Sequence, residues 1–252
     1  MIEFPAVQKQ VIRNHYDVST LFYRLLWGPH IHHGYWEGQE SSARAQVQLT
    51  ERLARNLQCE VTGVTLSAVQ KNWATWAARL RGVRPSPRFL RADAEQVTFP
   101  ASSADLLWSI ECTEHLFDKP AFFRRSAEWL RPGGRFALLA WLAGKDPLTP
   151  AQTEQAKAVC KGMFCPSLGS QDDYVSWFEQ AGYRVLKTGL WTRQVEQTWE
   201  ICLQRVNRSG VRYLAKLLGQ NHTLFLNHFQ AILDAYRSGA MEYGYFVAEK
   251  IG

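Results

Sequence analysis

Two groups of side chains in this sequence have residue types and spacing suited to proton transfer. His30, His32 and His33 stand close together near the N-terminus, and Glu114 and His115 follow an apolar run. A histidine or carboxylate beside a ligand can take a proton from a hydroxyl group or a ring carbon. A metal site would require neutral imidazoles that converge on one point. His32 and His33 would face opposite sides of an extended segment, so we expect no metal.

Each candidate site residue could instead have a purely structural role. Glu114 and His115 could act in acid–base catalysis or lie in the first turn of a helix, where a glutamate is favourable. Asp93 follows a short apolar segment and could accept a hydrogen bond from a ligand or initiate a turn. Tyr16 could close over a ligand or pack in the core as part of an amphipathic helix. For Asp93 we favour the ligand role, and for the pair Glu114-His115 both interpretations stay open.

Strands and helices that alternate along the chain must position these side chains. The apolar patterns predict strands at 59–65, 89–93, 104–110, 135–141, 183–191 and 241–250, and helices within 5–28 and at 42–57, 67–81, 119–130, 150–161, 171–181 and 196–237. Ser67 is the expected N-cap of its helix, and residues 131–134 (Arg-Pro-Gly-Gly) predict a tight turn. Strands that alternate with helices indicate a mainly parallel sheet, whose carboxyl ends bind ligands.

Composition excludes several classes of protein. With 252 residues, 46% of them apolar and 21% charged, the chain is neither disordered nor fibrous. The longest apolar run, 136–144, is about half of the ~20 residues of a spanning helix, so we expect no membrane span. Five cysteines without a CxxC pattern favour a reduced, cytoplasmic protein. The net charge is +6, and part of the positive charge comes from an arginine-rich stretch at 79–91. We interpret this stretch as a solvated surface rather than a nucleic-acid site.

Six segments, in order and at consistent spacing, carry a family resemblance. They are 14–17 (NHYD), 27–36 (WG through HHGYW), 62–70 (TGVTLSAVQ), 91–94 (RADA), 108–115 (WSIE with EH) and 130–134 (LRPGG). The sequence resembles a class I S-adenosylmethionine (SAM)-dependent methyltransferase. Within that superfamily it is most similar to the tocopherol O-methyltransferase-like branch, which is related to the cyclopropane fatty-acid synthase group.

The resemblance implies a fold and a domain plan. It implies an α/β, Rossmann-like, mainly parallel sheet with helices on both faces and a helical cap. A single methyltransferase domain would span 1–252. Within it we expect an N-terminal helical segment at 1–57, a SAM-binding core at 58–145, a helical cap with a late strand at 146–240, and a last strand at 241–252.

The resemblance also implies an activity and a set of site residues. The protein would transfer a methyl group from SAM to a small, apolar or aromatic metabolite, releasing S-adenosylhomocysteine. The aromatic content of 13% suits such a pocket. The cofactor would be held by Tyr16, His32, Gly34, Thr65, Gln70, Asp93, Ala94 and Ile110, and the acid–base candidates are His33, Glu114 and His115. Cyclopropane synthases carry a cysteine where His33 stands, so alkene cyclopropanation is disfavoured.

One part of the family pattern is missing. Relatives carry a first strand and a glycine-rich SAM loop before the strand at 59–65, whereas this chain has no glycine between Gly38 and Gly63 and no Gly-x-Gly. A block of about 25 residues is therefore absent. Three explanations stay open: an edited portion of a longer chain, a natural or engineered deletion, or an unrecognised replacement. The alternative function is accordingly a non-catalytic pseudoenzyme or binding protein on the methyltransferase fold.

Overall fold

The structure is a computed structural model that describes residues 1–252 except 27, 29–30, 54–59, 83–86, 209–225 and 227. His30, the end of the helix predicted at 42–57 and the first residue of the strand predicted at 59–65 lie outside the described residues. Within the described part of the chain, no helix is both long enough and apolar enough to cross a membrane.

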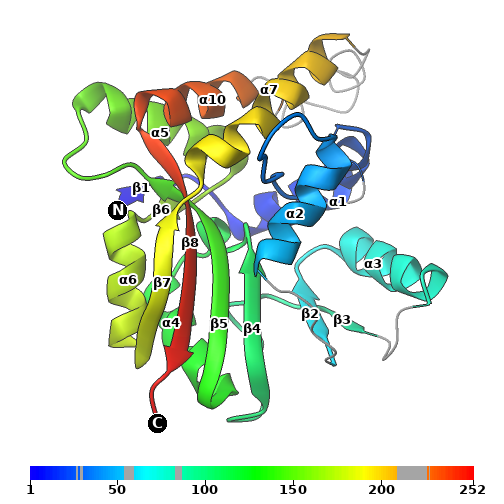
Figure 1. The fold of residues 1–252 in the computed structure, drawn as a ribbon, viewed down its shortest axis with the longest axis vertical. Coiled ribbons are helices and arrows are strands. Elements are labelled where there is room, and N and C mark those ends of the chain that lie inside the picture. Colours follow the sequence, from blue (N-terminus) through cyan, green and yellow to red (C-terminus); the bar gives the residue numbers. More distant parts are fainter. Residues whose placement is uncertain (27, 29–30, 54–59, 83–86, 209–225, 227) are drawn as a thin grey trace.

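A four-stranded sheet in the order β4-β5-β8-β7 forms the centre of the molecule (Figure 1). Its strands are β4 (Ala104–Ile110), β5 (Leu130–Ala143), β7 (Tyr183–Leu190) and β8 (Met241–Lys250). β4 and β5 are parallel, whereas β8 runs antiparallel to both β5 and β7. β5 is buried from Phe136 to Ala143 because it has a neighbour on each side.

Helices enclose the sheet in two apolar clusters. α4 (Lys119–Trp129) and α6 (Gln171–Gln180) pack an aromatic cluster that includes Phe123, Phe136 and Phe178 against the sheet. α5 (Pro150–Met163), α7 (Thr192–Arg208) and α10 (Phe229–Ser238) lie together across one end of the sheet (Figure 1). This arrangement confirms the α/β, Rossmann-like fold with a helical cap.

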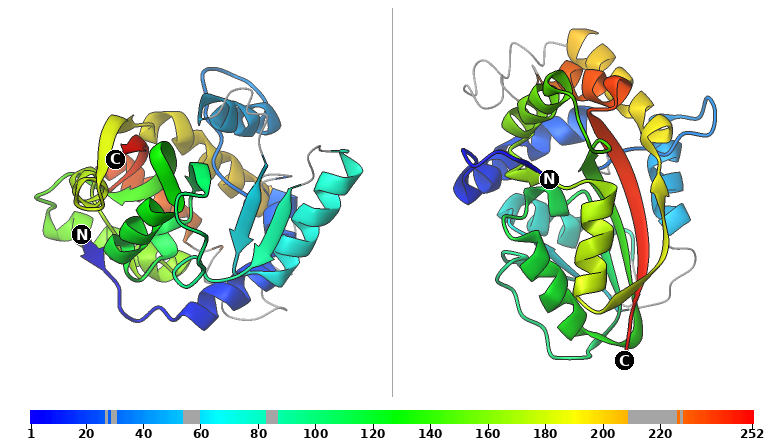
Figure 2. Two further views of the ribbon diagram at one scale, coloured as in Figure 1. Left: turned by 90° about the horizontal axis from the view of Figure 1, so that it is seen from below. Right: turned by 90° about the vertical axis from the view of Figure 1, so that its left-hand side faces the viewer.

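A second, two-stranded sheet stands beside the first. β2 (Thr62–Thr65) and β3 (Arg88–Arg91) are parallel and are connected through α3 (Ala68–Leu80). Ser67 is the N-cap of α3, as predicted, and its side chain accepts a hydrogen bond from the backbone N–H of Gln70. Among the described residues no strand joins this pair to the larger sheet, and the left view of Figure 2 shows the two sheets apart.

The N-terminal segment completes the fold. β1 (Ile2–Glu3) pairs antiparallel with β6 (Ser167–Leu168), a contact that the sequence patterns did not predict. α1 (Lys9–Leu26) and α2 (Ser42–Leu53) follow. α1 occupies most of the helix predicted within 5–28, and α2 occupies the described part of the helix predicted at 42–57.

The segment predicted as a turn at 131–134 lies inside a strand of the structure. β5 already begins at Leu130, which pairs with Ala104 of β4 before the register shifts ahead of Leu106. Gly133 supplies the left-handed backbone, with φ of 74°, that this irregular start requires. Residues 131–134 have no partner on β4, which pairs with Leu130 and next with Arg135, so the segment forms a turn-like bulge at the start of β5.

Candidate active site

α1 lies across the carboxyl ends of three strands. Asp17 accepts a hydrogen bond of 2.6 Å from the hydroxyl of Ser67, which follows β2. Lys9 reaches Asp93, beyond β3, at 2.6 Å and Glu95 at 2.7 Å. These long-range contacts bring the ends of β2, β3 and β4 to one helix. Neither Lys9 nor Asp17 was predicted as a positioning residue.

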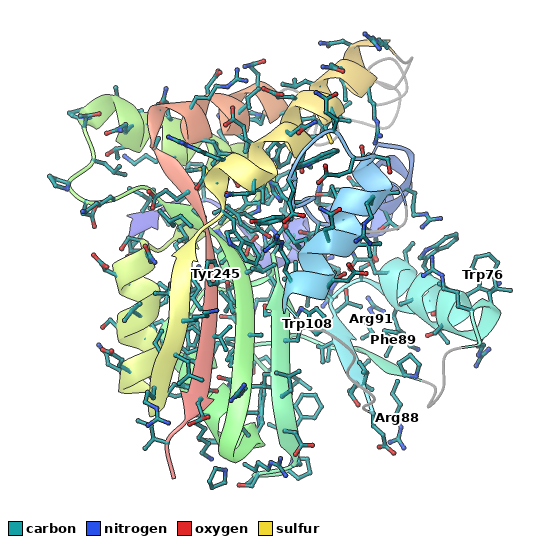
Figure 3. The ribbon with its side chains drawn as sticks, in the orientation of Figure 1. Trp76, Arg88, Phe89, Arg91, Trp108 and Tyr245 are labelled. Atoms are coloured by element: carbon teal, nitrogen blue, oxygen red, sulfur yellow. The ribbon has the colours of Figure 1, made fainter. Side chains whose placement is uncertain are left out.

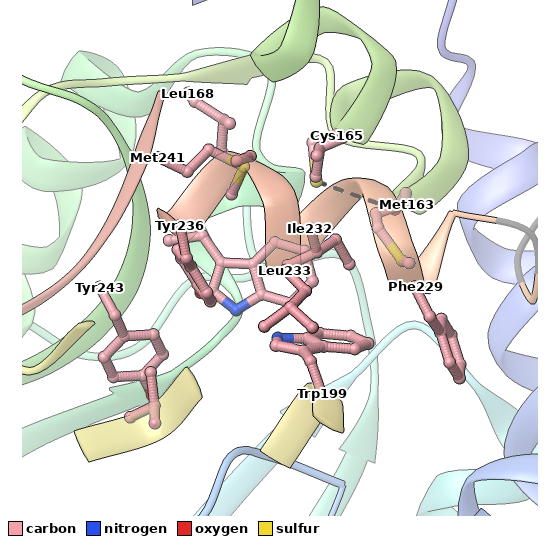
Figure 4. Close-up of a cluster of buried hydrophobic side chains, with 14 of the residues drawn as sticks. Met163, Cys165, Leu168, Trp199, Phe229, Ile232, Leu233, Tyr236, Met241 and Tyr243 are labelled. Carbon is pink, nitrogen blue, oxygen red and sulfur yellow. Dashed lines mark hydrogen bonds between the residues drawn. The ribbon is translucent and has the colours of Figure 1, made fainter. Parts of the chain in front are cut away.

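A small enclosed cavity lies where β4 ends. Its volume of about 30 Å³ accommodates a single hydroxyl or methyl group. The lining residues come from distant parts of the chain: Tyr16, Tyr23, Ile31, His33, Glu111, Glu114, His115, Trp141, Met163 and Trp199. All three predicted acid–base residues are therefore in one place. Figure 4 shows Trp199 and Met163 within the surrounding apolar cluster, together with Tyr236 and Tyr243.

Glu111 is the polar centre of the cavity wall, and its role was not predicted. Its Oε1 accepts hydrogen bonds from the backbone N–H of His33 (2.9 Å) and the hydroxyl of Tyr243 (2.8 Å). Burial would raise the pKa of Glu111, but its contacts with His33 outweigh burial and lower it. Its backbone is left-handed, with φ of 50°, a conformation that non-glycine residues adopt mainly at constrained or functional positions. The signal in the sequence was a single acidic residue that ends an apolar strand.

His33 is held between Glu111 and Trp199. Its Nε2 lies 2.6 Å from the indole nitrogen of Trp199, which can only donate, so Nε2 accepts and is unprotonated. A neutral imidazole then carries its proton on Nδ1. That atom is 2.9 Å from Oε1 of Glu111, an ion-pair distance, although the ring N–H does not point at the oxygen closely enough for a hydrogen bond.

Glu114 is buried without a partner. Its side chain is 1% exposed, and neither carboxyl oxygen has a hydrogen-bond partner within the described structure. Burial raises the pKa of Glu114 well above its ordinary value, and the negative charge of Glu111 adds to the rise. Glu114 lies in the short 3₁₀ turn η1 (Thr113–His115) and accepts no capping hydrogen bond there. Burial therefore disfavours the charged form of this carboxyl group at the cavity wall.

Tyr16 and His115 form the opposite side of the cavity. The Nδ1 of His115 is 3.2 Å from the carbonyl oxygen of Phe164, which can only accept, so the proton is on Nδ1. The hydroxyl of Tyr16 then donates to Nε2 at 2.7 Å. Burial lowers the pKa of His115 to about 4, so the ring is neutral at physiological pH.

The predicted nucleoside-binding residues gather at the ends of β2 and β3. The hydroxyl of Thr65 donates to the side-chain oxygen of Gln70 at 2.6 Å, and Asp93 pairs with Lys9. The carbonyl of Ala94 accepts a hydrogen bond of 3.0 Å from Arg125. These hydroxyl, amide and carboxylate groups are the types that the ribose and the adenine amino group of SAM require. A bound nucleoside would replace some of their present partners.

The remaining predicted residues lie near the cavity. His32 donates from Nδ1 to the carbonyl of His33, and burial lowers its pKa. Gly34 donates its N–H to Thr198 and packs so closely that a Cβ there would lie 2.7 Å from that of Ala45. Ile110 ends β4 and packs against the larger apolar cluster. The described residues contain no cluster suited to a metal ion.

Comparison with known proteins shows which family the chain resembles. The family described as "Methyltransferase domain" matches residues 44–138. Tocopherol O-methyltransferase from Arabidopsis thaliana is 24% identical over 292 residues, covering 95% of this chain and 81% of that protein. The chain is similar to SAM-dependent methyltransferases over these residues. SAM is accordingly its cofactor.

Two further comparisons define the extent of the similarity. A relative from Oryza sativa subsp. japonica is 26% identical over 236 residues, which are 77% of this chain and 65% of that protein. The structure of the cyclopropane synthase MmaA2 from Mycobacterium tuberculosis superposes with a TM-score of 0.82 at 17% identity, covering 98% of this chain and 100% of that one. The likeness to MmaA2 concerns the fold.

Proposed function

We propose that this protein transfers a methyl group from SAM to the hydroxyl or acidic carbon of a small, apolar or aromatic metabolite. The observation that carries the proposal is the cavity at the end of β4. It contains four buried polar atoms without hydrogen-bond partners among the described residues: the two carboxyl oxygens of Glu114, the indole nitrogen of Trp141 and Nδ1 of His33. Unpaired buried polar atoms destabilise a fold unless a ligand satisfies them.

SAM supplies an already activated methyl group, so the protein's task is to align the acceptor and to remove its proton. We assign the base to His33. An acceptor hydroxyl that replaces the Trp199 N–H would lie against Nε2 of His33 and could pass its proton to that atom. The Glu111 carboxylate would stabilise the resulting imidazolium, as a carboxylate beside an imidazole does in other enzymes. Glu114 and the Tyr16–His115 pair, which also line the cavity, would orient the acceptor.

The surroundings of the cavity favour an apolar acceptor. Trp141 and Trp199 form part of its wall, and Tyr236 and Tyr243 pack behind them. Aromatic walls with a few polar groups are typical of sites for flat or hydrocarbon ligands. Cys112, Cys160, Cys165 and Cys202 are free thiols in the described structure, consistent with the reduced cytoplasm that we propose as the protein's location.

The separation of β2–β3 from β4 favours a second candidate function. A ligand that contacts the ends of β2, β3 and β4 together requires those ends to be held in a fixed relation, and no described strand pairing fixes them. Under this alternative, the protein is a pseudoenzyme that binds a small apolar molecule in the β4 cavity and transfers no methyl group.

The test is methyl transfer from radiolabelled SAM to a panel of phenols, polyketides and terpenoids. The proposal expects labelled product with the unaltered chain and little with His33→Gln, while Gln48→Ala, away from the cavity, should retain activity. Product formation at equal rates by the unaltered chain and His33→Gln would contradict the assignment of the base. Binding of a panel compound without transfer would favour the pseudoenzyme.

A further inference from the structure

The cavity at the end of β4 is too small for the acceptors that its walls suit. Its volume is about 30 Å³. A cavity of about 150 Å³ is what holds a benzene ring in a protein interior. An aromatic acceptor can therefore enter only if a part of the wall moves aside. The part that moves must also uncover the base, because the acceptor's proton has to reach it.

Trp199 of α7 blocks the space and the base together. Its indole N–H donates to Nε2 of His33 at 2.6 Å, so the lone pair that would take the acceptor's proton is already in use. The Trp199 side chain is buried, and its ring meets the His33 ring edge-on with the centres 5.3 Å apart. If another wall residue such as Trp141 or Tyr16 moved instead, Nε2 would stay covered. Displacing Trp199 alone frees both the volume and the lone pair.

The backbone of α7 is anchored next to Trp199. The hydroxyl of Thr198 accepts a hydrogen bond of 3.0 Å from the backbone N–H of Gly34. One turn earlier, the carbonyl of Gln194 accepts one of 2.9 Å from the N–H of Trp36. These bonds hold the helix against the segment that precedes α2. The site therefore opens by rotation of the Trp199 side chain rather than by movement of the whole helix.

Tyr236 of α10 offers the indole N–H a second acceptor. The Tyr236 hydroxyl is buried and has no hydrogen-bond partner among the residues that the structure describes. Burial raises the pKa of Tyr236 well above its ordinary value, so the hydroxyl is neutral, and the side chain of Trp199 acts in the opposite direction from close by. In Figure 4 the indole nitrogen of Trp199 is on the side of the ring toward Tyr236. A bond made in a second state of the protein would account for this unpaired hydroxyl.

The rings around Trp199 favour a planar occupant of the space that it vacates. Besides His33, the indole ring meets Trp141 and Phe229 edge-on, with ring centres 5.8 and 5.2 Å apart. Edge contacts between rings stabilise a site beyond the burial of their area. A planar acceptor ring can renew these contacts, whereas a flexible hydrocarbon chain cannot. The exchange therefore selects rings that carry a hydroxyl within reach of Nε2.

We propose that Trp199 is a gate with two positions. In the first position its indole N–H covers Nε2 of His33. In the second the N–H donates to the hydroxyl of Tyr236, and a planar ring occupies the vacated space with its own hydroxyl on Nε2. Trp199 and Tyr236 take no part in the proton transfer and determine which acceptors reach the base. The gate rests on the proposed methyl transfer, because it assigns the acceptor class of that same cavity.

The first test follows the Trp199 indole N–H by proton–nitrogen NMR while naphthol is added without SAM. The Trp199 signal is the indole signal that is lost in Trp199→Phe. Trp76 and Trp108, exposed on α3 and β4 in Figure 3, serve as references. We expect naphthol to move the Trp199 signal upfield, because the N–H gives up a bond of 2.6 Å to an imidazole nitrogen for one to a hydroxyl. Decanol, whose hydroxyl is on a flexible chain, should leave the signal in place.

The second test measures naphthol affinity by calorimetry. Trp199→Phe keeps most of the ring but has no N–H on the base, so it should bind naphthol about tenfold more tightly than the unaltered chain. Tyr236→Phe removes the second position and should bind about tenfold more weakly, without a loss of Tm, since it also removes an unpaired hydroxyl. Trp177→Phe, in the separate apolar cluster around α6, is the matched control and should bind naphthol as the unaltered chain does.

Three results would overturn the gate. They are naphthol binding that leaves the Trp199 signal in place, no naphthol binding by either the unaltered chain or Trp199→Phe, and unaltered affinity in Tyr236→Phe. Labelled product from an aromatic acceptor together with an unmoved Trp199 signal would remove the gate and leave the methyl transfer. A moved signal without labelled product would keep the gate as the entrance of a binding site and remove the methyl transfer.

Discussion

Replacing Glu114 by leucine should make the protein more stable and less active. The carboxyl group is buried and has no partner among the described residues. A buried polar group without a hydrogen bond costs about 1–3 kcal/mol, and leucine fills similar space without polar atoms. For a chain of this length each kcal/mol shifts Tm by about 2–4 °C. We therefore expect Glu114→Leu to raise Tm by about 2–12 °C at pH 8, as measured by thermal unfolding.

The pH dependence of this gain has a definite sign. Burial raises the pKa of folded Glu114 above the ordinary value of 4.5. Folding then favours the protonated form, so this group's contribution to stability is greatest below pH 4.5 and falls as pH rises toward the folded pKa. The Tm difference between Glu114→Leu and the unaltered chain should therefore grow from pH 4 to pH 8. The control Glu114→Gln should remove the pH slope while leaving an unpaired amide. A leucine variant less stable than the unaltered chain at pH 8 would refute the reasoning.

Three other substitutions test the rest of the site. Glu111→Gln should lower kcat about 100-fold or more, because the imidazolium of His33 loses its carboxylate; a change below threefold, with an unaltered circular dichroism spectrum, would remove this pair from the mechanism. Asp93→Ala should weaken S-adenosylhomocysteine binding about tenfold in calorimetry, and unchanged affinity would exclude Asp93 from the site. Gly34→Ala should destabilise the protein by about 1–3 kcal/mol in denaturant unfolding, because its Cβ would overlap Ala45. The control Gly38→Ala has room and should be nearly neutral; equal losses would contradict the packing argument.

Local patterns in the sequence predicted the elements best. The strands at 104–110 and 241–250 have the predicted ends. The first lies between the polar residues Ser103 and Glu111, and the second follows the helix-ending Gly239. Ser67 caps α3 as expected because its hydroxyl acts on the backbone three residues away. The segment predicted as a turn at 131–134 is a turn-like bulge within β5, because β4 pairs with Leu130 and Arg135 on either side of it and with none of the four residues between them.

The candidate site was predictable only in part. The sequence indicated His33, Glu114 and His115 through their family positions, and the fold brings them to one cavity. Glu111 and Trp199 were missed because their partners lie 78 and 166 residues away along the chain. No local pattern encodes such contacts. The sequence also indicated that a strand is absent before the strand at 59–65, and that expectation stays a prediction.

Calorimetry with S-adenosylhomocysteine tests the central claim most directly. The account predicts saturable binding with one site per chain, and a rise in Tm with ligand concentration, because a ligand that binds only the folded state stabilises it. Absence of both heat and a Tm shift at millimolar ligand would contradict the claim that this chain is a SAM-dependent enzyme.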